Sequence, residues 1–134
     1  KVNTFVVDFL TAVQSFAGFN IELPSDYDGG TVTAVFYWVA NSASTNSVVW
    51  GIAGIAYSDG LALDTAFGTS VEVADANNGT NLINISTQTS AITLAGTPAA
   101  GQHAQFRVYR LGSGADTLSS TARLLGVRLT YTRL

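Results

Sequence analysis

The stretch TVTAVFYWVA (residues 31–40), NSASTNS (residues 41–47) and VVWGIAGIAY (residues 48–57) contains no charged residue. Aromatic and β-branched residues recur in it with a period of two, which is typical of β-strands. Both faces of the first run are largely apolar, so we expect this strand to be covered on both sides. We interpret the two apolar runs as a hairpin in the middle of a sheet.

Further short strands are expected on both sides of this stretch. The best defined are residues 103–110 and 125–132, which alternate between apolar and polar side chains. Weaker patterns predict strands at residues 2–10, 19–23, 71–73, 82–85 and 91–94, a turn at residues 25–30 and a short helical turn within residues 62–70. About eight strands without a long helix predict an all-β, two-sheet antiparallel sandwich, with residues 1–134 as a single domain. A jelly roll fits this strand number best, and an immunoglobulin-like sandwich is the alternative.

Charged residues make up only 11% of the chain, whereas about 25% is usual. Because surface charge suppresses association, this deficit predicts a protein that works as an assembly. The net charge of −3 gives a nucleic-acid partner no electrostatic support. No membrane contact is expected either, because NSASTNS divides the apolar stretch into pieces of about ten residues, too short for a spanning helix.

The charges are unevenly distributed, since eight of the nine acidic residues precede residue 101 and five of the six basic residues follow it. We favour ion pairs within the domain, where C-terminal strands lie beside N-terminal ones. The alternative is a contact between subunits, in which the basic face of one copy meets the acidic face of the next. The candidate residues for such an oligomer or capsid interface are Arg107, Arg110, Arg128 and Arg133.

Few residues suggest a metal or catalytic site. Asp26 and Asp28, in the segment SDYDGG, are two residues apart, as carboxylates of a calcium loop are. The other ligands of that loop are missing, so we interpret the segment as a tight turn and expect no metal or other cofactor. Asp59 and Asp64 are weaker candidates still. The single histidine, His103, is expected on the surface, and without a G-x-S-x-G motif in the chain we expect no enzyme.

Carbohydrate binding is the main alternative to a structural role. Tyr27 lies in the predicted turn and is therefore the best candidate for an exposed ring that stacks on a glycan. Trp38 and Trp50 lie in strongly apolar strands, so we expect both of them in the core. Two N-x-S/T sequons, at Asn78 and Asn84, matter only if the protein follows a eukaryotic secretory route.

Three segments of the chain carry a resemblance to a known type of domain. They are LPSDYDGG (residues 23–30), VVWGIAGIAYSDGLALDTAFG (residues 48–68) and FRVYRLGSGADTLSSTARLLGVRLTYTR (residues 106–133). In the order of these motifs the chain resembles β-sandwich domains of structural proteins in tailed-phage virions, such as capsid decoration proteins, head fibres and tail-associated jelly rolls. The resemblance extends from about Phe19 to Arg133.

This resemblance implies a repetitive coat or appendage protein of the virion, commonly trimeric, that binds a major capsid protein or another virion protein. Domains of this type have no characteristic catalytic residues, so the resemblance assigns a catalytic role to no residue of this chain. We therefore expect a non-enzymatic, oligomeric virion protein. The alternatives are a carbohydrate-binding or receptor-binding module, and a self-assembling filament subunit that is extracellular or on the cell surface. An edge strand can also recruit a neighbour by strand addition, and the arginine-flanked last strand is one place for it.

Overall fold

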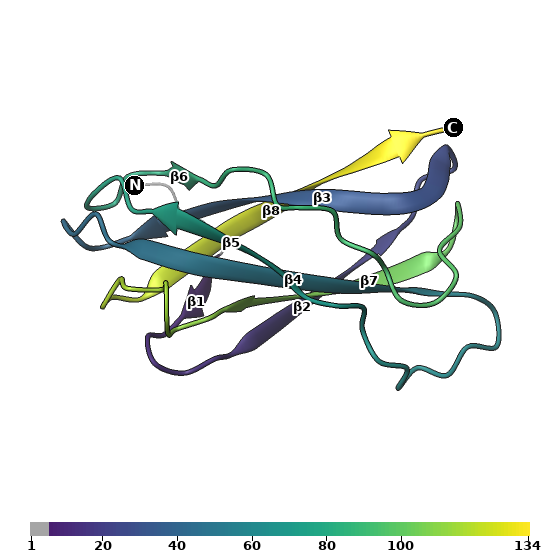
Figure 1. The fold of residues 1–134 in the computed structure, drawn as a ribbon, viewed down its shortest axis with the longest axis horizontal. Helices are drawn as coiled ribbons and strands as arrows, with labels where there is room; N and C mark the ends of the chain where they lie inside the picture. The colour runs from purple at the N-terminus through teal and green to yellow at the C-terminus, as the bar shows by residue number, and fades with distance from the viewer. Residues whose placement is uncertain (1–5) are drawn as a thin grey trace.

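The computed structural model describes residues 6–134, which form eight β-strands and no helix (Figure 1). The strands are β1 (Val7–Phe9), β2 (Phe16–Glu22), β3 (Tyr27–Ala40), β4 (Ser47–Tyr57), β5 (Val71–Ala76), β6 (Asn84–Ile85), β7 (His103–Arg110) and β8 (Ala122–Arg133). The prediction of an all-β, two-sheet antiparallel sandwich is confirmed. The first part of the strand expected at residues 2–10 lies outside the described residues.

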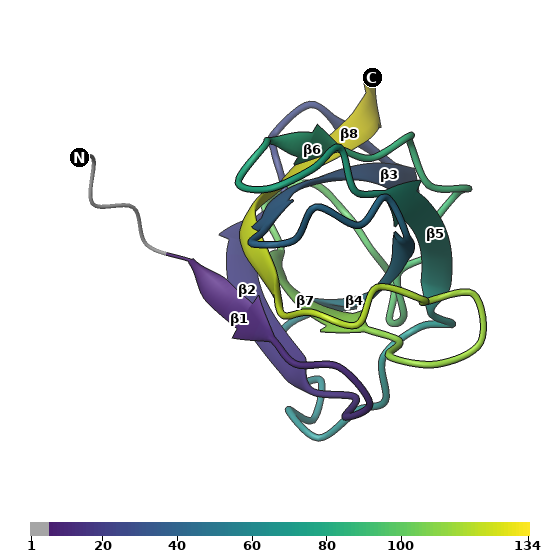
Figure 2. The same ribbon diagram turned by 90° about the vertical axis from the view of Figure 1, so that its left-hand side faces the viewer.

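The strands form two antiparallel four-stranded sheets that enclose one core (Figure 2). Sheet A has the order β1-β8-β3-β6, and sheet B has the order β2-β7-β4-β5. The pairs are nested: β1 pairs with β8, β2 with β7, β3 with β6 and β4 with β5. This nesting is the connectivity of a jelly roll. An immunoglobulin-like sandwich keeps its first two strands side by side in one sheet, whereas β1 and β2 lie in different sheets here.

The predicted hairpin of β3 and β4 is wrong, because these two strands belong to different sheets. Residues 41–46 carry the chain from sheet A to sheet B, so the two strands bring their apolar inward faces to the same core from opposite layers. β4 is buried along almost its entire length. The ring of Tyr109 covers its outer face at Gly51, and Gly68 of the loop 58–70 hydrogen-bonds to Gly54.

The centre of the core is a cluster of aromatic rings from both sheets. Trp38 of β3 and Trp50 of β4 are both 0% exposed, which confirms the prediction for these residues. Trp50 stacks on Phe36, with 5.7 Å between ring centroids, and meets Phe9 edge-on at 5.2 Å. Such pairs contribute about 0.5–1.5 kcal/mol beyond the apolar area that they bury. The cluster therefore ties β1, β3 and β4 together.

Three local predictions differ from the structure. The turn expected at residues 25–30 is shorter, because β3 already begins at Tyr27. Residues 62–70 form an irregular loop instead of a helical turn. Residues 91–94 make only an isolated bridge to β3, through Ile92, and not a regular strand. In each case tertiary contacts, rather than local propensity, decide the conformation.

A bulge in β8 changes which of its residues face the core. The register with β3 shifts between Tyr37 and Trp38, which leaves Leu125 as an extra residue in β8. Leu124 therefore faces the core, and the inward series resumes at Val127. The regular alternation expected for residues 125–132, with Leu125 on the same face as Val127, is therefore wrong at Leu125, because a period-two pattern does not reveal an inserted residue.

The two lateral sides of the sandwich differ. On one side, residues 84–96 run along the edge of β3 and then reach sheet B. Ser86 and Thr89 each donate a backbone N–H to β3 and accept one from β3 at the side-chain hydroxyl, and Ala95 continues to β4. This segment provides hydrogen-bond partners for the backbone at the edge of β3 and covers that side of the sandwich. On the other side β1 has only 3 residues, so within residues 6–134 β2 and most of β8 border an open seam.

Candidate functional site

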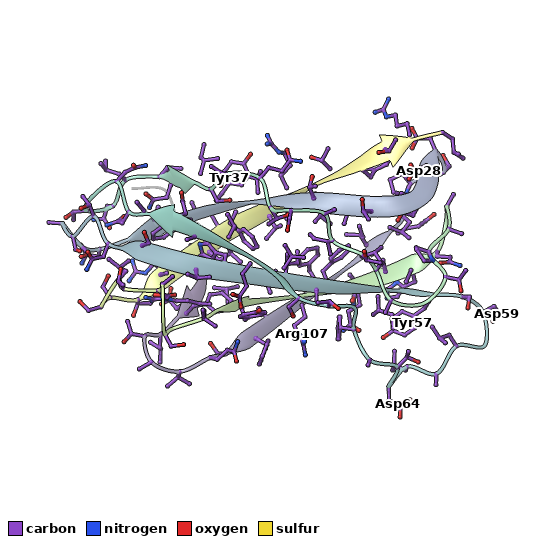
Figure 3. The ribbon with its side chains drawn as sticks, in the orientation of Figure 1. Asp28, Tyr37, Tyr57, Asp59, Asp64 and Arg107 are labelled. Atoms are coloured by element: carbon purple, nitrogen blue, oxygen red, sulfur yellow. The ribbon has the colours of Figure 1, made fainter. Side chains whose placement is uncertain are left out.

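The residues that the sequence singled out for chemistry do not converge on one place. Asp28 lies at the start of β3, whereas Asp59 and Asp64 lie in the loop that follows β4 (Figure 3). Within residues 6–134, no group of three or more His, Cys, Asp or Glu side chains is arranged to hold a metal ion. His103 is exposed at the start of β7, as predicted, with its ring centroid 6.1 Å from that of Tyr57.

Asp26 and Asp28 are directed to different partners. Asp26 accepts a hydrogen bond of 2.8 Å from the Tyr131 hydroxyl and forms an ion pair with Arg133 at 3.3 Å. The hydrogen bond raises the pKa of Tyr131, because it favours the protonated phenol. Asp28 accepts a hydrogen bond of 2.8 Å from the backbone N–H of Gly30. The two carboxylates thus stabilise the start of β3 and the end of β8, each in its own contact.

Tyr27 is buried, with 1% of its surface exposed, so the prediction of an exposed stacking ring is wrong. The shorter turn makes Tyr27 the first residue of β3 and directs its ring into the core, edge-on to Tyr131 at 6.1 Å. Its hydroxyl donates to the carbonyl of Gly30. Burial, together with the nearby Asp28 carboxylate, raises the pKa of Tyr27. A glycan therefore has no access to this ring.

Arg110 is also buried, with 0% exposure, which removes it from the candidate interface residues. It forms a bidentate ion pair with Asp116, with a shortest N–O distance of 2.7 Å and both side chains 1% exposed. Backbone groups satisfy the rest of the pair: the carbonyls of Phe9, Leu118 and Ser120 accept from the guanidinium, and the N–H groups of Val49 and Gly112 donate to the carboxylate. Arg110 therefore joins β1, β4, β7 and the loop before β8.

The three other candidate arginines have different surroundings. Arg107 is half-buried, and its guanidinium lies 4.8 Å and 4.9 Å from the ring centroids of Phe16 and Phe67. Arg133 is engaged by Asp26, as described above. Arg128 is exposed and has no ion pair with any of the described residues. Arg128 therefore combines exposure with the lack of an acidic partner among the described residues, and its charge is available to a partner.

Ion pairs within the domain explain part of the charge asymmetry. Arg123 pairs with Asp8 at 3.3 Å, and Arg133 pairs with Asp26 at the same distance. In both cases an arginine of β8 lies beside an acid from the first part of the chain, as we expected from sandwich geometry. Both pairs are largely exposed, so they contribute little to stability.

The two sequons differ in accessibility. Asn78 is exposed, whereas Asn84 is 0% exposed. Asn84 is the first residue of β6, and its buried amide donates to the side-chain oxygen of Asn77 at 3.1 Å. Only Asn78 presents its amide on the surface of the folded domain.

The open side of the sandwich contains an apolar groove between β2 and β8, which we call the β2–β8 groove. It consists of two cavities, of about 320 Å³ and about 280 Å³. The first is lined chiefly by Val6, Ala17, Phe19, Leu125 and Val127, and the second chiefly by Ile21, Leu23, Leu129 and Tyr131. Glu22, in the second cavity, is the one charged residue among those that line the groove. Most of these side chains belong to the strands predicted at residues 19–23 and 125–132, but no local pattern indicated how short β1 is.

Exposed apolar side chains gather at two further places. Leu82, Ile83 and Ile85 lie around β6 and are 52%, 54% and 58% exposed; we call them the β6 patch. A second set lies around the connection from β1 to β2 and consists of Leu10, Val13 and Phe16. Contiguous exposed apolar residues mark contact surfaces more often than single ones do.

Comparison of the chain with protein-family models, with curated proteins and with solved structures finds no significant match. Among residues 6–134, no helix has the length and hydropathy needed to cross a membrane.

Proposed function

We propose that this domain is a non-enzymatic structural protein of a tailed-phage virion, a capsid decoration or appendage subunit that works by binding other proteins. The observation that supports it most is the β6 patch, three apolar side chains that are each more than half exposed. Burying what remains exposed of these side chains favours association by roughly 3 kcal/mol in total. The small number of charged residues on the surface opposes such contacts little.

In this proposal the β6 patch forms the contact between copies, and a trimer is the favoured assembly. The exposed edge of β6 lies at the border of sheet A, so a neighbouring copy can approach it from the side. A stable interface buries more than about 1,000 Å² in total, so residues around the patch have to take part as well. The major capsid protein or another virion protein is the further partner.

Light scattering coupled to size exclusion tests this proposal. One chain has a mass of 14.0 kDa, so a closed trimer has 3 × 14.0 = 42.0 kDa. We expect the trimer for the natural chain and the monomer for Ile85→Asp. The matched control is Leu63→Asp, because Leu63 is 79% exposed and lies in the loop after β4, away from the patch. A natural chain that stays monomeric and does not sediment with tailed-phage capsids would refute the proposal.

The two alternatives have their own tests. A carbohydrate-binding module lacks its main candidate ring, since Tyr27 is buried, and it predicts hits on a glycan array. A filament subunit predicts extended polymers instead of a closed ring in the light-scattering measurement. Neither alternative has an observation of its own in the described residues.

A further inference from the structure

We propose that the β2–β8 groove accepts an extended segment of a partner protein, which adds to the edge of β8 as an antiparallel strand. The segment has apolar side chains at every second position and an acidic side chain opposite Arg128. The inference deepens the proposed function, because it names the kind of partner, but the strand site itself does not depend on the β6 patch.

The first argument is the open edge of β8. β1 pairs with this edge only at Ala122, Arg123 and Leu124. From Gly126 to Tyr131, β8 pairs with β3 on one side and has no strand on the other among the described residues. Such an edge presents unpaired N–H and C=O groups, which are a template for another strand. β1 already occupies the same edge in antiparallel pairing, so an added strand continues an arrangement that the fold contains.

The second argument is the form of the groove. Its two cavities follow one another along β8, the first beside Val127 and the second beside Leu129 and Tyr131. In an added strand, side chains on one face recur about every 6.6 Å, two residues at about 3.3 Å each. The inward side chains of such a strand therefore lie along Val127, Leu129 and Tyr131 in turn, and so along both cavities. This alternation of pockets is the usual basis of specificity in strand addition.

The third argument concerns the chemistry of the occupant. A lipid chain fills apolar cavities but offers no hydrogen bonds to the backbone of β8, whereas a peptide does both. Arg128 lies on the outer face of sheet A, between the inward residues Val127 and Leu129, and is without an acidic partner in the described residues. An acid on the outward face of the added strand complements it. A second copy pairing through its own β8 would bring like charges together instead.

The test uses a fluorescent, capped peptide of about ten residues, which spans roughly 33 Å when extended. Valine and threonine alternate in it, with one glutamate among the polar positions. Because the pattern repeats, the peptide fits in any register. We expect saturable binding to the full chain by fluorescence anisotropy, tighter than about 1 mM, and slower hydrogen exchange at the amides of residues 125–131. No saturable binding in this range would overturn the proposal.

Two modified peptides separate strand addition from simple apolar adhesion. One carries N-methyl groups on every valine and the other on every threonine, so that each loses the N–H groups of one edge only. Because each hydrogen bond to β8 strengthens binding, losing several is expected to weaken binding at least about tenfold. We expect this loss for one of the two peptides only. Equal binding by both would overturn strand addition.

Variants of the protein locate the site. Ala17→Trp fills the first cavity and is expected to weaken peptide binding at least about tenfold, whereas Ala66→Trp, at an exposed position of the loop after β4, leaves it unchanged. Arg128→Glu is expected to weaken binding of the peptide that contains glutamate and to strengthen binding of the same peptide with lysine in place of glutamate. Equal affinities for the two tryptophan variants would place the site elsewhere and refute the proposal. The N-methyl comparison remains decisive if Ala17→Trp does not fold.

Two results would assign the groove to another occupant and also overturn the proposal. Binding that appears only after removal of residues 1–5 would assign it to the chain's own first residues. Self-association that Ala17→Trp abolishes would assign it to a second copy. Failure of the virion proposal can be distinguished from failure of the strand site. The virion proposal is tested by the mass of the natural chain and of Ile85→Asp and by sedimentation with capsids, and the peptide measurements involve neither.

Discussion

Replacing Asp116 with asparagine removes the negative charge beside a fully buried guanidinium while it preserves the shape of the side chain. Arg110 then keeps its charge at 0% exposure, with only backbone carbonyls and one amide oxygen around it. Removing one partner of a buried ion pair costs about 3–5 kcal/mol, because the remaining charge is left uncompensated. At about 0.05–0.15 kcal/mol per residue, this is a large part of the stability of a chain of 134 residues.

Urea unfolding, followed by tryptophan fluorescence, measures this loss. With an m-value of about 2 kcal/mol per M, a loss of 3–5 kcal/mol lowers the midpoint by roughly 1.5–2.5 M. Asp8→Asn is the matched control, since it removes the same charge from the exposed pair with Arg123, whose side chains are 51% and 45% exposed. For this control, the free energy of unfolding is expected to decrease by less than about 1 kcal/mol.

Salt provides an independent check on the same reasoning. An exposed pair is screened at high ionic strength, whereas a buried one is screened much less. The difference between Asp116→Asn and the natural chain is therefore expected to persist in 1 M salt, where the Debye length is about 3 Å. Midpoints for Asp116→Asn and Asp8→Asn that agree within error would refute the argument that burial makes the Arg110 pair strong.

Two further predictions concern sheet B and its edge. Gly51→Ala places a Cβ 2.1 Å from the ring of Tyr109, and displacing that ring is expected to lower the free energy of unfolding, measured in urea, by about 1–3 kcal/mol. The control is Gly126→Ala, whose added Cβ meets nothing within 4 Å. Equal losses of stability in the two variants would contradict the explanation. Asp75 has its pKa raised from 3.8 by burial, against the opposing effect of its hydrogen bond from Trp38. The folded state therefore favours the protonated acid, so stability from this group is present below pH 3.8 and is lost as the pH rises through the folded pKa. Asp75→Asn removes this dependence, and its stability relative to the natural chain is expected to increase from pH 3.5 to pH 7; a difference that is constant over this pH range would exclude the titration.

The sequence predicted strands well where both the pattern and the packing are local. Residues 103–110 became β7 with the expected bounds, and the apolar character of the central strands placed Trp38 and Trp50 in the core. Strand pairing was not predictable in the same way, because an apolar strand fits beside another strand or across the core from it equally well. The wrong hairpin of β3 and β4 follows from that ambiguity.

The candidate site was predicted least well, and the reason is the same for each residue. Tyr27 and Arg110 have side chains that are usually exposed, and only the tertiary structure provides the turn and the Asp116 partner that bury them. The β2–β8 groove depends on how few residues of β1 pair with β8, which no local pattern records. Arg128 and Arg133 keep the exposure that the charge pattern suggested, although Arg133 is paired with Asp26.

The nested pairing of the strands also governs when the chain is able to fold during synthesis. β1 and the long strand β3 both need β8, which begins at Ala122, as their partner in sheet A. From Val7 to Ala122 the ribosome adds 122 − 7 = 115 residues, which takes roughly 6–23 s at about 5–20 residues per second. During that time the apolar faces of β3 and β4 are without their final cover. A chain that terminates before Ala122 therefore lacks the strand that lies between β1 and β3, and it cannot complete sheet A.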